Sequence, residues 1–521
     1  MNLIDDRWIP IRRADGSTDK IAPWEITQDI HDEKRKIIAV ASPRPDFDGA
    51  LTQFLIGLLQ TACTPETEDA WWEWLETPPI SEQLQNRINP FAASFDLGRD
   101  VPRFMQDYKH TELTETLEIA ALFIEAPGAK ALKENKDHFI KRDTIKQLCP
   151  ECVSAALFTI QLNAPSGGQG HRTGLRGGGP LTTLVIGESL WESCWLNVLI
   201  KSNYMGENIM LGKDETDKRF PWLSSTHTGK DTYPSDIHPD QQFWAMPRRM
   251  FLIEENLSKP EACNLCGQET VQIYKQFRTK NYGINYMGAY EHPLSPHYIK
   301  DNAPNPVHPQ PGGFGYRHWL GFVENSQEGN SEKRPARVIN QFRSLSRKDG
   351  NLWAFGYDMD NMKARSWYDS RMPILIIVAE HKETFRGYVE QLIQSANWIA
   401  DNLSKKLKKA VFGETEMRGN FAFIKALFWH QTENIFYQTM YQLRDALLIN
   451  QSVSEIKLSW RSKLSQDALV IFDEKSQTGD FDAVDPRRVA SARNELYSIL
   501  YGNKLKEILG FPKEKTKKKK R

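Results

Sequence analysis

The sequence has no net charge: its 521 residues include 67 lysines and arginines against 67 aspartates and glutamates. A balanced chain does not coat nucleic acid through its overall field. Any nucleic-acid binding would depend on local basic patches or be shared with partners. No uninterrupted apolar run reaches the roughly 18 residues of a membrane-spanning helix, and the N-terminus has no basic and apolar leader. We therefore expect a cytoplasmic protein.

Catalytic motifs are also missing. The glycine-rich stretch 163–187 contains no lysine and precedes a strand-like segment, so it is neither a phosphate-binding P-loop nor a dinucleotide fingerprint. There is no Gly-x-Ser-x-Gly elbow and no His-Glu-x-x-His helix. His292, His297 and His308 occur among prolines without a carboxylate at helical ligand spacing, and scattered loop histidines explain them better than a second metal site.

Cysteine is scarce, and six in a cytoplasmic chain of this size do not make a disulfide framework. Four of them form two Cys-x-x-Cys pairs, Cys149 with Cys152 and Cys263 with Cys266. This is the ligand set of a closed tetrahedral zinc site. A thioredoxin-type redox motif is the alternative, but neither pair lies in a clear βα unit. We predict a structural zinc that joins distant parts of one domain.

The secondary-structure signals change character near residue 372. Residues 1–372 alternate short strand-like runs, among them 314–323, with helical segments and long polar stretches, of which 291–350 is the longest. Segment 46–62 has the composition of a buried helix. Residues 373–512 have the periodicity of four helices, at about 380–411, 419–449, 452–474 and from 485 on, and their mostly short connections favour a four-helix bundle.

The predicted fold class is therefore α+β. A large irregular mixed α/β N-terminal domain with a structural zinc site, residues 1–372, precedes a C-terminal four-helix bundle, residues 373–512. The tail 513–521 holds seven basic residues against one glutamate, and we expect it to be disordered. Two further basic stretches, 130–146 and 404–409, are each typical of a solvated helix face or a helix C-terminus.

Glycine is abundant in one place, with eight in the 25 residues of 163–187. Glycine permits positive φ and the close approach of a large neighbour. Gln169, His171, Arg172 and Arg176 lie among these glycines and supply donors that suit phosphate or a groove edge. We expect this stretch to approach a ligand closely, and a tight glycine-rich connection is the alternative.

Five segments occur in a specific order: NLIDDRWIPI (2–11), CPEC (149–152), APSGGQGHRTGLRGGGPLTTLV (164–185), CNLCGQE (263–269) and RVINQFRS (337–344). Together they resemble the CasA family, the large subunit of the type I-E CRISPR surveillance complex Cascade. The resemblance implies a non-catalytic subunit that recognises the protospacer-adjacent motif (PAM) in double-stranded DNA, starts duplex unwinding and R-loop formation, and helps to recruit a helicase-nuclease. Its partners would be the guide RNA, the other Cascade subunits and the target DNA.

The resemblance also assigns roles to residues of this chain. The loop that approaches the PAM minor groove falls on Gly168, Gln169 and Gly170, and Gln169 stands where the family pattern has glycine. The wedge that starts unwinding falls on Gln341 with Asn340 beside it, although a polar turn after a short strand is the local interpretation. Narrow grooves admit backbone that lacks side chains, and inserted wedges unstack base steps.

A lysine that contacts the PAM in relatives aligns with Asn281, so either the preceding Lys280 takes over this contact or the contact is made differently. The four cysteines match the zinc positions of the family. The C-terminal helices would contact DNA and move when the R-loop forms. The loop directed toward the guide RNA falls on a set suited to stacking and phosphate binding: His138, Phe139, Lys141 and Arg142.

Two other classes of function stay open at this point. A stand-alone zinc-containing nuclease would need clustered carboxylates or histidines for catalytic metals, and no such cluster is evident. A scaffold that contacts only protein fits poorly with basic loops that carry aromatic residues.

Overall fold

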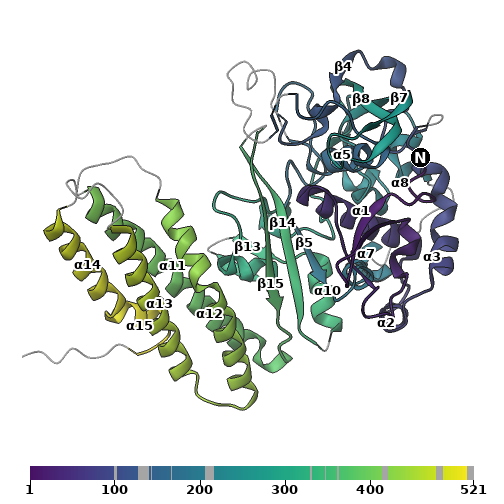
Figure 1. Ribbon diagram of the computed structural model, residues 1–521. Coiled ribbons are helices and arrows are strands. Elements are labelled where there is room, and N and C mark those ends of the chain that lie inside the picture. The colour runs from purple at the N-terminus through teal and green to yellow at the C-terminus, as the bar shows by residue number, and fades with distance from the viewer. Residues whose placement is uncertain are drawn as a thin grey trace, which may run out of the picture. The chain divides into compact units, whose positions relative to one another are not determined.

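The computed structural model describes residues 1–98, 102–126, 140–141, 143–165, 167–205, 216–328, 331–346, 348–360, 363–412, 421–476 and 485–512 (Figure 1). Its contacts divide the chain into an N-terminal unit, Met1–Gln310 with Gln327–Arg371, and a C-terminal unit, Pro311–Ser326 with Met372–Arg521. Among the helices of these described ranges, none is long and apolar enough to cross a membrane.

Helices and strands alternate along the first 374 residues, which gives a mixed architecture. The helices are α1 (Pro45–Cys63), α2 (Glu68–Glu76), α3 (Ser81–Ile88), α5 (Pro150–Asn163), α6 (Leu190–Trp195), α7 (Lys201–Met205), α8 (Thr216–Arg219), α9 (Trp319–Phe322) and α10 (Arg337–Leu345). The strands are β1 (Ile9–Arg13), β2 (Thr18–Ile21), β3 (Ile37–Val40), β4 (Glu115–Glu118), β5 (Thr182–Ile186), β6 (Asp231–Thr232), β7 (Arg249–Ala262), β8 (Glu269–Lys280), β9 (Asn285–Tyr286), β10 (His297–Lys300), β11 (Ala303–Pro306), β12 (Ser326–Glu328), β13 (Ser331–Arg334), β14 (Gly350–Asp360) and β15 (Lys363–Ile374).

These strands form several small sheets rather than one large one. Their orders are β2-β1-β3, β4-β8-β7, β15-β14-β5, β11-β10-β13-β12 and β6-β9. In the second sheet, β7 and β8 are long antiparallel partners that form a hairpin. The two ends of this hairpin carry the two candidate sites described below.

Helix α1 forms the centre of the N-terminal unit, as its apolar sequence predicts. The ring of Phe54 packs edge-on against five other aromatic rings, with centroid distances between 5.4 and 5.9 Å. The five are Trp8, Phe95, Phe104, Phe158 and Trp244. Aromatic pairs in this geometry are each worth about 0.5–1.5 kcal/mol beyond the area that they bury. Helix α1 therefore holds α5 and the segments around residues 95–104 and 244 together.

Two stretches differ from their predicted structure. Segment 314–323 forms a 3-10 turn (Tyr316–His318) and α9 instead of a strand, because Tyr316, Trp319 and Phe322 are buried at a spacing of three and Gly321 has φ +95°. The stretch 291–350 contains β10 to β13 and α10, where the sequence predicted a long loop.

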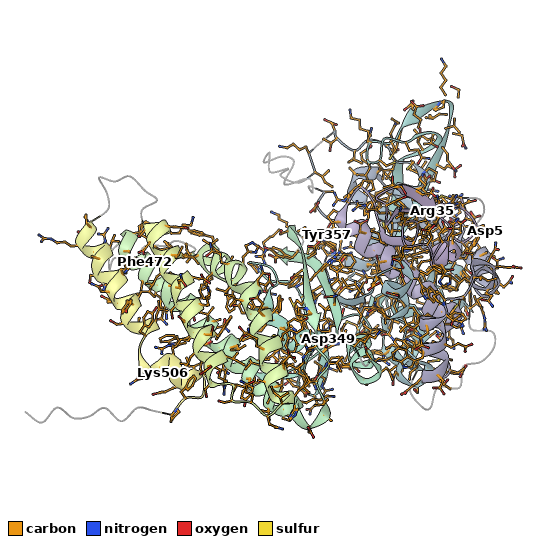
Figure 2. The ribbon with its side chains drawn as sticks, turned by 60° about the horizontal axis from the view of Figure 1, so that its bottom comes forward. Asp5, Arg35, Asp349, Tyr357, Phe472 and Lys506 are labelled. Carbon is orange, nitrogen blue, oxygen red and sulfur yellow. The ribbon has the colours of Figure 1, made fainter. Side chains whose placement is uncertain are left out.

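The C-terminal unit is helical where the sequence predicts helices. It contains α11 (Lys382–Phe412), α12 (Ala422–Leu448), α13 (Ser454–Ser476), α14 (Pro486–Leu500) and the unpredicted short α15 (Asn503–Ile508). Helix α11 contacts α12, α13 and α14. Phe472 of α13, labelled in Figure 2, is fully buried. Asp485 caps α14 by accepting hydrogen bonds from the backbone N–H groups of Arg487 and Arg488.

Candidate metal centre and nucleic-acid interface

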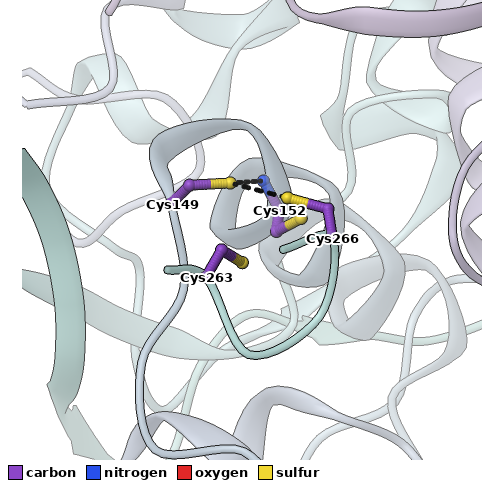
Figure 3. Close-up of side chains that lie close together, drawn as sticks. All are labelled: Cys149, Cys152, Cys263 and Cys266. Carbon is purple, nitrogen blue, oxygen red and sulfur yellow. Dashed lines mark hydrogen bonds between the residues drawn. The ribbon is translucent and has the colours of Figure 1, made fainter. Parts of the chain in front are cut away.

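The two Cys-x-x-Cys pairs come together although 110 residues separate them (Figure 3). Cys149 is the N-cap of α5 and Cys152 lies in the first turn of that helix. Cys263 and Cys266 lie in the turn that connects β7 with β8. The four sulfur atoms lie within 4.8 Å of one another. The sequence prediction that these cysteines form one cluster is confirmed.

The sulfur positions fit a tetrahedral zinc ion. Zinc–sulfur bonds of about 2.3 Å in a tetrahedron place the sulfurs about 3.8 Å apart. The Sγ atoms of Cys149 and Cys266 are 3.7 Å apart. Four cysteine sulfurs would complete a tetrahedral site and leave no open coordination position, so the donor set suits a structural zinc.

Backbone contacts fix the hairpin turn against the start of α5. The Asn264 side-chain oxygen accepts hydrogen bonds from the backbone N–H groups of Lys146 and Gln147, at 2.8 and 2.9 Å. Leu148 and Tyr274 exchange two backbone hydrogen bonds, at 2.9 and 3.0 Å. The cysteine cluster therefore joins one end of α5 to one end of the β7–β8 hairpin.

The other ends of the same two elements meet as well. The glycine loop, Gly167–Gly170, follows the C-terminal end of α5, and the turn Lys280–Tyr282 follows β8. The Asn281 Nδ2 donates to the carbonyl of Gln169 at 2.9 Å, and the backbone N–H of Tyr282 donates to the carbonyl of Gly170 at 2.9 Å. The structure thus brings together two groups of residues that the sequence assigned separately.

This contact explains a glycine in the loop. Gly170 has φ +77°, and a Cβ there would lie 2.9 Å from the Asn281 Cβ and 3.1 Å from the Tyr282 ring. Both reasons for glycine, positive φ and close approach, apply at this position. The close neighbour is the turn at Lys280–Tyr282. Gly168, Gln169, Lys280 and Asn281 remain exposed beside one another.

An arginine contacts both sides of the glycine loop. Arg248, which the sequence analysis missed, donates from Nη2 to the carbonyl of Pro165 at 2.5 Å and contacts the His171 ring. Burial lowers the pKa of Arg248 to about 10. Burial and the neighbouring Arg248 charge lower the pKa of His171. Arg248 contacts the glycine loop, whereas the adjacent Arg249 does not. Nothing in the sequence around this pair distinguishes the two arginines.

Arg176 does not belong to this surface, which corrects the expectation that it supplies a donor there. Its side chain is 3% exposed and donates hydrogen bonds to Gln53 at 2.7 Å, Thr182 at 3.0 Å and Ser295 at 3.2 Å. Burial lowers its pKa to about 9. Arg176 therefore fixes the later part of the glycine-rich stretch to α1 and β5.

The predicted wedge pair lies in α10 and not in a polar turn, because Val338, Ile339 and Phe342 are buried at helical spacing. Asn340 is exposed. Gln341 is 3% exposed and faces the segment after α6.

The amide of Gln341 uses both of its ends in this contact. Its Oε1 accepts hydrogen bonds from the Ile200 backbone N–H and the Asn203 Nδ2, both at 2.9 Å. Its Nε2 donates to the Val198 carbonyl at 2.9 Å. In this conformation Gln341 connects α10 to residues 198–203, and Asn340 is the member of the pair that reaches the surface.

The predicted guide-contacting loop falls mainly outside the described residues, which include Lys141 but not His138, Phe139 or Arg142. Lys141 is exposed, and its carbonyl accepts a hydrogen bond from the Thr144 hydroxyl at 2.7 Å. Of the three histidines in the proline-rich stretch, His292 and His297 are buried and His308 is half-buried, and burial lowers the pKa of His297 to about 4.

Solved structures of CRISPR-associated proteins share this fold over almost their whole length. Thermobifida fusca Cse1 matches with a TM-score of 0.72 at 14% identity, with 98% of each chain covered. Thermus thermophilus CasA (Cse1) matches with a TM-score of 0.65 at 15% identity, over 98% of this chain and 99% of the other. A chain of a CRISPR RNA-guided surveillance complex matches with a TM-score of 0.66 at 13% identity, over 96% and 99%.

The sequence itself gives the family. Residues 2–471 match the family model described as CRISPR-associated protein Cse1. The chain therefore belongs to the Cse1 family, and the resemblance to the large subunit of Cascade is confirmed.

Proposed function

We propose that this chain reads the PAM in double-stranded DNA as the non-catalytic large subunit of type I-E Cascade. It works with a guide RNA and the other Cascade subunits, starts duplex unwinding and R-loop formation, and helps to recruit the helicase-nuclease. Its membership of the Cse1 family and the similarity to a chain of an RNA-guided surveillance complex support this assembly. In such systems protein reads the short flanking motif, and base pairing with the guide reads the rest.

The observation that carries the proposal is the junction between the glycine loop and the turn after β8. Gly168, Gln169, Lys280 and Asn281 form one exposed surface although more than a hundred residues separate the two segments. The hydrogen bonds of Asn281 and Tyr282 to the loop carbonyls hold this surface in one shape. A preorganised polar surface with few side chains suits the minor groove, which is only about 6 Å wide.

The residues of this surface take distinct roles in the proposal. Glycine backbone enters the groove, and the Gln169 side chain reaches base edges there. The Asn281 side chain is already engaged with the loop, so Lys280 is the group that contacts the DNA from the turn. Because the minor groove separates mainly A·T from G·C pairs, recognition of the flank would be degenerate.

The wedge step involves α10. Asn340 presents its side chain to solvent and is the first group that the duplex meets. Gln341 inserts only after its three hydrogen bonds to residues 198–203 break. The proposal therefore couples wedge insertion to a local movement between α10 and this segment.

Three further parts complete the proposal. His138, Phe139, Lys141 and Arg142 contact the guide RNA, Cys149, Cys152, Cys263 and Cys266 bind a structural zinc, and α11 to α14 act as a four-helix bundle that responds to the R-loop. In α11, Lys406 and Lys409 bind Glu495 at 2.6 and 2.8 Å. This pairing reduces the charge that the basic stretch 404–409 offers to DNA.

A comparison of two glycine substitutions tests the function. Gly170→Ala adds a Cβ at the junction, whereas Gly229→Ala is a matched control at φ +79° with no atom within 4 Å of the added Cβ. Each variant is assembled with guide RNA and partner subunits, and strand opening is followed by a base-analogue fluorophore on targets with a preferred or a scrambled flank. We expect Gly170→Ala to lose flank-dependent opening and the control to keep it. If both variants discriminate flanks as the unmodified chain does, this loop does not read the PAM.

A further inference from the structure

Beside the glycine loop, the Arg172 side chain lies over the ring of Tyr282. Its guanidinium carbon lies 5.9 Å from the centroid of the Tyr282 ring. Tyr282 has φ +67° and a side chain that is 42% exposed. A bulky residue in the left-handed region is strained by on the order of 1–3 kcal/mol, and such strain persists where the surroundings determine it. Here the hydrogen bond from Tyr282 to Gly170 and the ring contact with that glycine fix the conformation.

Arg248 approaches the loop from the side of α5. Hydrogen bonds between the Gln161 side chain and the backbone N–H and carbonyl of Arg248, both at 3.0 Å, hold its backbone. Its guanidinium binds the Pro165 carbonyl before the loop and His171 after it. Arg248 therefore clamps both sides of the loop and leaves a positive charge at its base.

These arginines have no carboxylate partner among the residues that the structure describes. The Nε–H groups of Arg172 and Arg248 are buried and make no hydrogen bond to described residues. The acids nearby act on other groups: Glu112 pairs with Arg249 at 3.0 Å, and Glu115 affects the pKa of His171. Burying guanidinium groups without a counter-charge is unfavourable. The chain as a whole has zero net charge, but positive charge is in excess at this loop. A ligand with negative charge would compensate this excess.

We propose that Arg172, with its guanidinium over the Tyr282 ring and with Arg248 beside the same loop, binds a backbone phosphate of duplex DNA next to the base pair that the glycine loop reads. A guanidinium group offers the planar fork of N–H donors that suits a phosphate. The phosphate supplies the missing negative charge and sets the register of the duplex, while the loop reads the groove. This inference rests on the proposed function.

The test measures binding of duplex targets by the assembled complex at several salt concentrations. Arg172→Gln removes the charge, and Arg172→Lys restores the charge without the planar fork. Lys34→Gln, at an exposed lysine elsewhere in the N-terminal unit, is the matched loss of one charge. We expect Arg172→Gln to weaken binding about tenfold, the size of one charge-assisted contact, and to reduce the salt-dependence slope by about 0.9. The ratio between preferred and scrambled flanks stays the same.

A second variant separates phosphate binding from loop stability. Tyr282→Asn removes the ring but suits positive φ, because asparagine tolerates the left-handed region. It should leave the melting temperature unchanged or raise it, and still weaken DNA binding. DNA with an uncharged methylphosphonate at single positions beside the flank then locates the contact. One position should weaken binding to the unmodified complex and have no effect on Arg172→Gln.

The outcomes distinguish this inference from the proposed function. If the unmodified complex discriminates flanks, but Arg172→Gln keeps its affinity and salt slope, Arg172 binds no phosphate and the proposed function stands. If Tyr282→Asn loses binding only because it unfolds, while Arg172→Gln binds normally, the contact between Arg172 and Tyr282 stabilises the fold and does not bind DNA. If the unmodified complex ignores the flank, both proposals are wrong.

Discussion

At the scale of single residues, burial decides which side chains of a motif can contact a ligand. The family resemblance implies a wedge at Gln341, but the Gln341 amide makes three hydrogen bonds to residues 198–203 and the residue is 3% exposed. If Gln341 both connects α10 to residues 198–203 and acts as the wedge, its side chain reaches DNA only after these hydrogen bonds break. The neighbouring Asn340 is exposed, and its side chain makes one long hydrogen bond, from Nδ2 to the Pro335 carbonyl at 3.5 Å.

Substitution of these two residues separates the roles. Gln341→Ala leaves the Ile200 N–H without its partner, which costs about 1–3 kcal/mol for a buried group. Asn340→Ala should change stability by less than about 0.5 kcal/mol, as surface substitutions do. Thermal unfolding of the chain measures both effects. If Gln341→Ala unfolds at the unmodified temperature and duplex opening is still lost, its side chain acts on DNA and not in the packing of α10.

At the scale of elements, hydrophobic periodicity predicts helices better than it predicts their partners. Helices α1 and α11 to α13 begin and end within a few residues of their predicted positions, and α14 begins within one residue of its predicted start, because apolar residues recur at helical spacing along each of them. The short α15 has too few residues for such a pattern. The strand predicted for 314–323 was wrong: Phe314, Tyr316 and Phe322 match alternation along a strand, but Trp319 matches only the spacing of three that the structure adopts.

Two buried cations on α13 stabilise the ends of the last two helices. The Arg461 guanidinium donates to the Leu500 carbonyl at 3.1 Å and the Gly502 carbonyl at 3.2 Å. The Lys457 ammonium donates to the Leu509 carbonyl at 3.2 Å and lies 4.1 Å from the Tyr388 ring centroid. Cations near helix C-termini are favourable because they neutralise exposed carbonyl dipoles.

The prediction at this scale concerns the last turns of α14 and α15. Arg461→Met keeps the apolar stem and removes the cap, so we expect a loss of about 1–2 kcal/mol and faster amide hydrogen exchange in residues 499–509. Lys463→Met, at an exposed position two residues along the same helix, is the control and should leave both unchanged. Equal exchange rates in the two variants would show that the Arg461 contacts contribute nothing to these helix ends.

At the scale of the whole molecule, the junction between Gly170 and Asn281 was beyond sequence analysis. The cysteine spacing predicted which residues cluster, since Cys-x-x-Cys pairs carry their own geometry. The junction has no such signature, because it depends on the lengths of α5 and β8. From the Leu148–Tyr274 bridge, the 14 residues of α5 extend about 21 Å, and the β8 segment from Tyr274 to Lys280 extends about 20 Å.

Because of this equal reach, we expect a metal at the cysteine cluster to stabilise the proposed interface at the far ends. Helix α5 and strand β8 are joined at the cysteine cluster and carry the glycine loop and the Lys280–Tyr282 turn at their far ends. A metal held by the four cysteines would add to the hydrogen bonds of Leu148, Tyr274 and Asn264 that join the first ends, so its loss would weaken the common anchor of the two far ends. The interface should then lose its shape although none of its own residues changes.

Cys266→Ser tests this coupling, because Cys266 is the exposed member of the set. We expect a zinc content well below one per chain, a melting temperature lower by about 5 °C or more, and weaker discrimination between preferred and scrambled flanks. Cys63→Ala, which removes a buried cysteine outside the cluster, should keep its zinc and its flank preference. Elemental analysis, thermal unfolding and the strand-opening assay measure the three effects on the same preparations. If Cys266→Ser loses zinc and stability but still discriminates flanks, then the contacts of Arg248 and Asn281 hold the interface without help from the metal centre.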